Sequence, residues 1–225
     1  MNGVVVFDVI ETLLDLSPLD KHFHRVFGDT VARQLWFGQM LQIAMTMTIT
    51  GTYENFGKAA EAALQMTASQ KSIDLTADDR KAILEQITLL PPHPDVRDAL
   101  QSLRAAGTRI AALTNSTEKA ATKQLQTAGI DENFEKILSV DAVKRYKPAR
   151  EAYEYAAREL GVGTGDILLV AAHAWDVAGA MAAGCQAAFV QRPGKSLNPL
   201  GKKPDLVVTD LRDLEQKLRR PARTA

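Results

Sequence analysis

Cysteine is almost absent from the sequence, which contains a single one, Cys185, among its 225 residues. No disulfide can therefore form within the chain, as is typical of proteins in a reducing compartment. A lone cysteine without a neighbouring histidine is more often a small buried apolar residue than a nucleophile. We therefore expect a cytoplasmic location and no chemistry at this residue.

Long apolar runs and an excess of one charge are absent as well. No stretch of about 18 apolar residues occurs, so no transmembrane helix is expected, and the N-terminus lacks the basic and apolar regions of a signal peptide. Lys+Arg and Asp+Glu balance at 27 each, whereas nucleic-acid and acidic-lipid surfaces need a basic excess. The basic stretch 218–223 is expected to be a frayed terminus. We expect neither a nucleic acid nor a membrane as a partner.

The first apolar run is followed by a long helical region. Residues 3–7, Gly-Val-Val-Val-Phe, are continuously apolar and rich in β-branched side chains, as in a strand that is buried on both faces. From about residue 18 to residue 92 the apolar residues recur at helical spacing. Helices are predicted there over 31–47, 53–66 and 76–89, with Thr76 as an N-cap.

After residue 94, predicted strands and helices alternate. Strands are predicted over 109–113, 136–139, 167–171, 186–190 and 206–208, and helices over 95–106, 117–128, 149–160, 176–183 and from about 211. Such alternation implies an α/β fold with a parallel sheet and helices on both of its faces. We predict a Rossmann-like core of residues 1–14 and 93–225, with residues 15–92 inserted as a helical cap.

Polar side chains follow the predicted strands at the edge of the sheet where ligands bind. Asp8 follows the first strand, Thr114 and Asn115 follow the second, and Lys147 and Asp176 lie close to later ones. An aspartate can attack carbon or phosphorus and form a covalent intermediate, and a nearby lysine keeps it ionised. Each residue alone also has a structural interpretation as a helix cap, a turn former or a solvated charge. Together they favour a catalytic site.

Four motifs in this order resemble those of the haloacid dehalogenase (HAD) superfamily. They are Phe7-Asp8 with Thr12-Leu13-Leu14, then Leu113-Thr114-Asn115, Tyr146-Lys147-Pro148 and Trp175-Asp176. The resemblance covers nearly the whole chain and includes the inserted helical region. It implies a HAD-like Rossmannoid parallel sheet with a helical cap that gates the site.

Two chemistries compete within the superfamily. Its phosphatases carry a second aspartate where this chain has Ile10, and an acidic magnesium ligand where it has Ala172. Because Mg²⁺ needs several oxygen ligands, the loss of a carboxylate weakens such a site. The chain is instead similar to the type II 2-haloacid dehalogenases, which use no metal. We therefore expect no cofactor, and Mg²⁺ only under the phosphatase alternative.

The resemblance implies roles for particular residues. Asp8 would displace halide from the α-carbon of a short 2-haloacid, and water near Lys147 and Asp176 would hydrolyse the resulting ester to a 2-hydroxy acid. The remaining candidates are substrate or supporting residues: Thr12, Thr114 and Asn115 for the carboxylates or the halide, Tyr153 to support Lys147, Trp175 as a substrate contact, and Phe37 with Trp36, Met40 and Phe56 as an apolar wall.

The chain also departs from the subfamily pattern. Glu11 replaces a glycine, Phe37 stands where the cap usually supplies an arginine, and Arg33 lies one helical turn earlier as a candidate substitute. Ala171 and His173 replace a serine and an asparagine. His173 is a candidate catalytic residue that activates water or contacts the halide, although a neutral histidine in a turn is an equally good interpretation.

Three functions therefore stay open at this point. The first is a dehalogenase acting on a small organic acid, and the second is a Mg²⁺-dependent phosphatase. The third is a binding or regulatory module that has lost turnover, which the missing cap arginine favours. Subfamily resemblance also suggests a homodimer. Neither the substrate, nor its halide, nor its enantiomer follows from the sequence.

Overall fold

The computed structural model describes residues 3–219 and contains a six-stranded sheet in the order β3-β2-β1-β4-β5-β6. All neighbouring strands are parallel, so the predicted α/β fold is confirmed. The strands are β1 (Val4–Phe7), β2 (Arg109–Thr114), β3 (Lys136–Ser139), β4 (Ile167–Ala171), β5 (Gln186–Val190) and β6 (Leu206–Val208). Residues 220–223 of the basic stretch lie outside the described residues, so their predicted fraying stays a prediction.

Strand β1 lies in the middle of the sheet because all four of its residues are apolar and buried. It pairs with β2 on one side and with β4 on the other, so that Phe7 is opposite Ala112 and Val170. The carboxyl ends of β2, β1 and β4 are therefore adjacent. This register places the residues that follow the three strands side by side at one edge.

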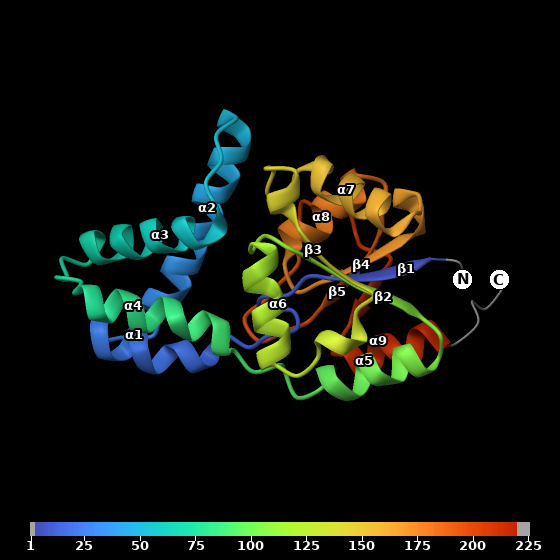
Figure 1. Ribbon diagram of the computed structural model, residues 1–225, viewed down its shortest axis with the longest axis horizontal. Coiled ribbons are helices and arrows are strands. Elements are labelled where there is room, and N and C mark those ends of the chain that lie inside the picture. The colour runs from blue at the N-terminus through green and yellow to red at the C-terminus, as the bar shows by residue number, and fades with distance from the viewer. Residues whose placement is uncertain (1–2, 220–225) are drawn as a thin grey trace.

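Helices cover both faces of the sheet (Figure 1). The core helices are α5 (Val96–Ala105), α6 (Glu118–Thr127), α7 (Arg150–Leu160), α8 (Ala174–Ala182) and α9 (Leu211–Arg219). Helix α7 ends at Gly161 as predicted, because this residue has a left-handed φ of 67° that favours glycine. The predicted start of α8 at Asp176 is wrong by two residues, since the helix begins at Ala174.

Four further helices pack together beside the sheet (Figure 1). They are α1 (Asp20–Phe27), α2 (Val31–Thr50), α3 (Phe56–Gln70) and α4 (Ala77–Gln86), the last followed by the short 3-10 helix η2 (Ile87–Leu89). The N-cap at Thr76 is confirmed, because its side chain accepts a hydrogen bond from the Asp79 backbone N–H at 3.1 Å. Trp36 of α2 is fully buried among these helices and donates to the Ala60 carbonyl at 2.9 Å.

Two segments that lie side by side connect the four helices to the sheet. The Asp15 N–H donates to the Pro91 carbonyl at 2.8 Å, and the His93 N–H donates to the Leu13 carbonyl at 2.9 Å. The helical unit therefore leaves the core and returns to it at the same edge, although further contacts join the two, such as the hydrogen bond from Tyr53 to Asp141 at 2.6 Å. We propose on this basis that the chain divides at 14/15 and at 92/93 into a core and a cap.

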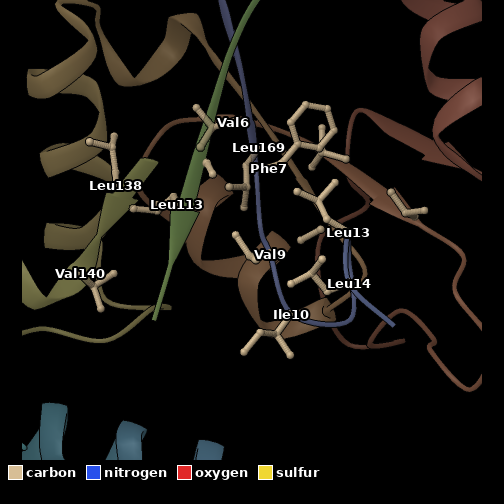
Figure 2. Close-up of a cluster of buried hydrophobic side chains, with 14 of the residues drawn as sticks. Val6, Phe7, Val9, Ile10, Leu13, Leu14, Leu113, Leu138, Val140 and Leu169 are labelled. Atoms are coloured by element: carbon tan, nitrogen blue, oxygen red, sulfur yellow. The ribbon is translucent and has the colours of Figure 1, made fainter. Parts of the chain in front are cut away.

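A hydrophobic cluster fixes the loop that follows β1. Val6, Phe7 and Val9 pack with Leu113 and Leu169 from the neighbouring strands (Figure 2). These side chains are almost fully buried, so the loop leaves the sheet in one defined direction.

Within residues 3–219, no helix combines the length and the apolar character that a membrane span requires.

Candidate active site

Asp8 is the first residue after β1 and accepts hydrogen bonds from three side chains. Lys147 Nζ donates to its Oδ1 at 2.8 Å, and Thr12 Oγ1 donates to its Oδ2 at 2.6 Å. Nδ1 of His173 lies 3.0 Å from the same Oδ2. The Thr12 hydroxyl in turn accepts from the Ala172 N–H at 2.9 Å, which ties the loop after β1 to the end of β4. The structure therefore gathers residues that are far apart in the sequence around one carboxylate.

Lys147 is buried and uses all three of its donors. Besides Asp8, its Nζ donates to Asp176 Oδ2 at 2.7 Å and to the Leu113 carbonyl at 2.9 Å. Its backbone N–H donates to Asn115 Oδ1 at 3.0 Å, so Asn115 holds the segment that carries the lysine. An ammonium with three good acceptors has a defined position even in an apolar interior. It lies between the two carboxylates and compensates both.

Asp176 lies in the first turn of α8, which corrects the interpretation of this residue as an N-cap. Tyr153 donates to its Oδ1 at 2.6 Å and also to its backbone carbonyl at 3.0 Å. The sequence predicted that Tyr153 supports Lys147, but the residue that Tyr153 contacts directly is Asp176.

Thr114 is buried, and its Oγ1 accepts from the Ser116 N–H at 3.1 Å, so it shapes the turn after β2.

His173 bridges two carboxylates. Its Nδ1 faces Asp8, and its Nε2 lies 2.9 Å from Glu11 Oε2. Because a carboxylate only accepts, both ring nitrogens are placed to donate, which requires the imidazolium form. Burial lowers the pKa of His173, but the hydrogen bonds and charges of Asp8 and Glu11 outweigh burial and raise the pKa to about 9. The neutral turn histidine considered from the sequence does not fit this geometry.

Glu11 is a site residue that sequence reasoning missed. Its backbone has a φ of 65°, a left-handed value that costs a residue with a side chain about 1–2 kcal/mol. The side chain contacts His173, forms an ion pair with Lys195, and lies 4.0 Å from Arg33 Nη1. Local strain that the surroundings hold in place often marks a functional position. The signal was present in the sequence, since Glu11 replaces the glycine of the subfamily.

Two aromatic rings enclose His173. Phe37 of the cap stacks on it with centroids 5.8 Å apart, and Trp175 stacks on it at 5.1 Å. Phe37 thus occupies the place predicted for the cap arginine and contacts the histidine instead of supplying a charge. Arg33 is bound to Asp20 and only approaches Glu11, so it does not replace that arginine beside Asp8. Among residues 3–219, the buried Trp175 Nε1 has no hydrogen-bond acceptor.

Comparison with known proteins agrees with this arrangement. The model of haloacid dehalogenase-like hydrolases matches residues 3–184. The chain belongs to this family.

Relatives of this haloacid dehalogenase-like hydrolase have similar length and fold. Haloacetate dehalogenase H-2 of Moraxella sp. (strain B) is 31% identical over 91% of this chain and 92% of its own. The (S)-2-haloacid dehalogenase of Pseudomonas sp. (strain YL) is also 31% identical, over 92% of this chain and 90% of its own. The solved L-2-haloacid dehalogenase of Xanthobacter autotrophicus superimposes with a TM-score of 0.92 at 25% identity, covering 99% of this chain and 100% of its own.

The charges of this hydrolase site are set by burial and by pairing. Burial opposes ionisation of Asp8, but Lys147 and His173 outweigh it and hold the pKa of Asp8 well below its ordinary value. Burial also opposes the charge of Lys147, yet Asp176 and Asp8 raise its pKa. For Asp176, burial and the negative charge of Asp8 raise the pKa by more than the positive charge of Lys147 lowers it, so the pKa is raised. Asp8 is thus a permanent anion, whereas Asp176 is the better proton acceptor.

A divalent metal does not fit the side chains around Asp8. Across the described part of the chain, no three His, Cys, Asp or Glu side chains are grouped to hold a metal ion. Lys147 Nζ lies within 2.8 Å of both Asp8 and Asp176, and its charge repels a cation. Ala172 offers no side-chain oxygen. Since Mg²⁺ requires several oxygen ligands in octahedral geometry, the donor set is unsuitable for it.

Replacing Glu11 with glutamine should lower the pKa of His173. The variant keeps a hydrogen-bond acceptor but removes one of the two anions that stabilise the imidazolium, and we expect a shift of roughly one pKa unit, about 1.4 kcal/mol. The ring resonances of His173 in NMR spectra report this titration directly. The change Glu54→Gln, at an exposed residue paired with Lys58, serves as the control and should leave the titration unchanged. An equal pKa in wild type and Glu11→Gln would contradict the bridging role.

Proposed function

We propose that the chain hydrolyses the carbon–halogen bond of 2-haloacids and produces 2-hydroxy acids through an ester on Asp8. The observation that carries this proposal is a buried, permanently ionised Asp8 that is held at a strand end by Lys147, Thr12 and His173. The names of the Moraxella and Pseudomonas relatives support the substrate class.

In the first step, Asp8 attacks the α-carbon of the substrate. Its Oδ1 accepts one hydrogen bond and its Oδ2 accepts two, so Oδ1 keeps the more available lone pair. The new C–O bond forms as the C–halogen bond breaks, and the halide leaves with the bonding electrons. The unpartnered Trp175 N–H and the positive charge of His173 are available to stabilise anions beside Asp8.

In the second step, water attacks the carbonyl carbon of the Asp8 ester. Asp176 is suited to take the proton, because its raised pKa makes it a stronger base than an ordinary aspartate. Tyr153 holds the orientation of Asp176. The ester C–O bond then breaks, and the product alkoxide takes up the proton held by Asp176. The second proton of the water leaves to solvent, and Asp8 is regenerated as a carboxylate with one oxygen from water. His173 cannot accept a proton from water while it is an imidazolium, so we assign it the role of a fixed charge.

We further propose that the reaction requires no metal, because Lys147 supplies the positive charge between the two carboxylates. The test is halide release from each enantiomer of 2-chloropropionate and from chloroacetate, with and without EDTA. We expect release that EDTA does not reduce. Loss of activity in EDTA that added Mg²⁺ restores would contradict this. Hydrolysis of a generic phosphate ester without any halide release would favour the phosphatase alternative.

A cytoplasmic homodimer completes the proposal. The single, buried Cys185 suits a reducing compartment. The cap helix α2 is apolar on more than one side, and Val31, Leu35 and Ile49 are exposed on it. Because a helix that is apolar all round is usually buried, this face supports contact with a second copy. Sedimentation velocity should give twice the chain mass, and a monomer at micromolar concentration would refute the dimer.

A further inference from the structure

An apolar cavity of about 220 Å³ lies between the cap and the core, outside the polar cluster around Asp8. Helices α2, α3 and α4 line it from the cap, and helix α6 with the turn before it lines it from the core. The side chains that give it its apolar character are Ile10, Trp36, Phe37, Met40, Phe56 and Ile87. None of the proposed catalytic groups occupies this space.

Three lining residues adjoin the catalytic cluster directly. Ile10 is two residues beyond Asp8 and lies at the edge of the hydrophobic cluster (Figure 2). Ser116 is next to Asn115, which holds the segment of Lys147. Phe37 stacks on His173, which contacts Asp8. A group attached to an α-carbon at Asp8 is therefore next to this cavity.

The cavity is larger than a short 2-haloacid needs. A cavity of about 150 Å³ with an apolar lining accommodates a benzene ring. The lining along α6 runs from Thr117 to Gln124, which is roughly 10 Å at the helical rise. A methyl group fills only a small part of such a space, and an unfilled apolar cavity destabilises a protein. The dimensions thus match an extended side chain rather than a methyl group.

Gln124 gives an independent indication that a ligand belongs in the cavity. Its side chain is almost fully buried, and its Nε2 donates to the Ile87 carbonyl at 3.1 Å. Among the residues that the structure describes, its Oε1 has no hydrogen-bond donor. A buried acceptor without a partner is costly, and such atoms are usually satisfied by water or by a ligand.

We propose that this cavity receives the side chain of the substrate, and that the preferred substrates are 2-halocarboxylates whose α-carbon carries a phenyl-sized apolar group. This inference rests on the proposed dehalogenation, because it places the reacting carbon at Asp8. It adds a subsite formed by Ile10, Phe37 and helix α6, which selects substrates by the size of that group.

The test compares 2-bromopropionate with 2-bromo-3-phenylpropionate in wild type and two variants. Ala120→Leu fills the cavity from α6, and Thr122→Leu is a matched change on the same helix outside the lining. We expect kcat/KM for the phenyl substrate to exceed that for the methyl substrate by at least about tenfold in wild type. Ala120→Leu should abolish this preference and keep activity on 2-bromopropionate, whereas Thr122→Leu should preserve both.

A binding measurement separates failure of the subsite from failure of the proposed function. Calorimetric titration with 3-phenylpropionate should show binding to wild type and Thr122→Leu, and binding at least about tenfold weaker to Ala120→Leu. Halide release without a preference for the phenyl substrate would overturn the subsite and leave dehalogenation standing. Binding of 3-phenylpropionate that Ala120→Leu weakens, with no halide from either substrate, would refute dehalogenation but support the subsite.

Discussion

Changing Asp8 to asparagine should reduce halide release by about 10⁴-fold or more, since no neighbouring group can replace a covalent nucleophile. The amide has nearly the shape of the carboxylate but is a poor nucleophile, and it no longer compensates Lys147 and His173. The ester on Asp8 can be detected by intact-mass spectrometry in a single turnover. In ¹⁸O-labelled water the regenerated Asp8 should gain the label before the product does.

Two controls make the Asp8→Asn experiment decisive. Intact mass must exclude deamidation of the new asparagine, which would restore the nucleophile during a long assay. Asp15→Asn changes a carboxylate in the same segment whose hydrogen bonds, among the described residues, come from Ser17, and it should keep wild-type activity. Wild-type rates in Asp8→Asn protein that has not deamidated would refute every mechanism with Asp8 as the nucleophile.

Lys147→Met should destabilise the fold by about 3–5 kcal/mol, besides abolishing activity. Methionine preserves the length and the apolar stem of the side chain, so packing changes little. The variant leaves Asp8 and Asp176 buried without their shared cation. The pKa of both carboxyls should therefore rise, and the loss of stability should diminish as the pH falls and they become protonated. Urea unfolding at several pH values measures this.

The stability prediction for Lys147 has a matched control and a rescue. Lys58→Met removes an exposed partner of Glu54 and should leave the free energy of unfolding unchanged, because solvent screens such a pair. Adding Asp176→Asn to Lys147→Met removes one uncompensated charge and should recover part of the lost stability. A double variant as unstable as the sum of the single ones would show that the two residues do not interact.

Much of the fold followed from local patterns in the sequence. The central strand is a short β-branched run, and its buried environment in a parallel sheet requires just such a sequence. Because ligand-binding residues follow the strands of a parallel sheet, the predicted strand ends were sufficient to identify Asp8 and Asn115 as candidate site residues. The start of α8 was missed, because its N-cap position, His173, provides no capping side-chain hydrogen bond, whereas Asp176 in the first turn is a residue type that favours N-caps.

Contacts between distant residues were beyond sequence reasoning. The ion pair of Glu11 with Lys195 joins positions 184 residues apart, and no local periodicity encodes such a pair. The partner of Tyr153 was misassigned for a similar reason, since Lys147 and Asp176 are both close to it in the fold. The size of the cavity depends on how the cap packs against α6, which the sequence does not reveal.

The position of β1 between β2 and β4 has a consequence for how the protein matures during synthesis. The nucleophile, at position 8, leaves the ribosome first, but its neighbours on the sheet and its cations come from residues 109–173. Until those residues have emerged, Asp8 has neither flanking strand and stays hydrated. A nascent chain thus carries an exposed, inert carboxylate, and the buried ionic cluster forms only after β2 and β4 have been synthesised and have docked on either side of β1.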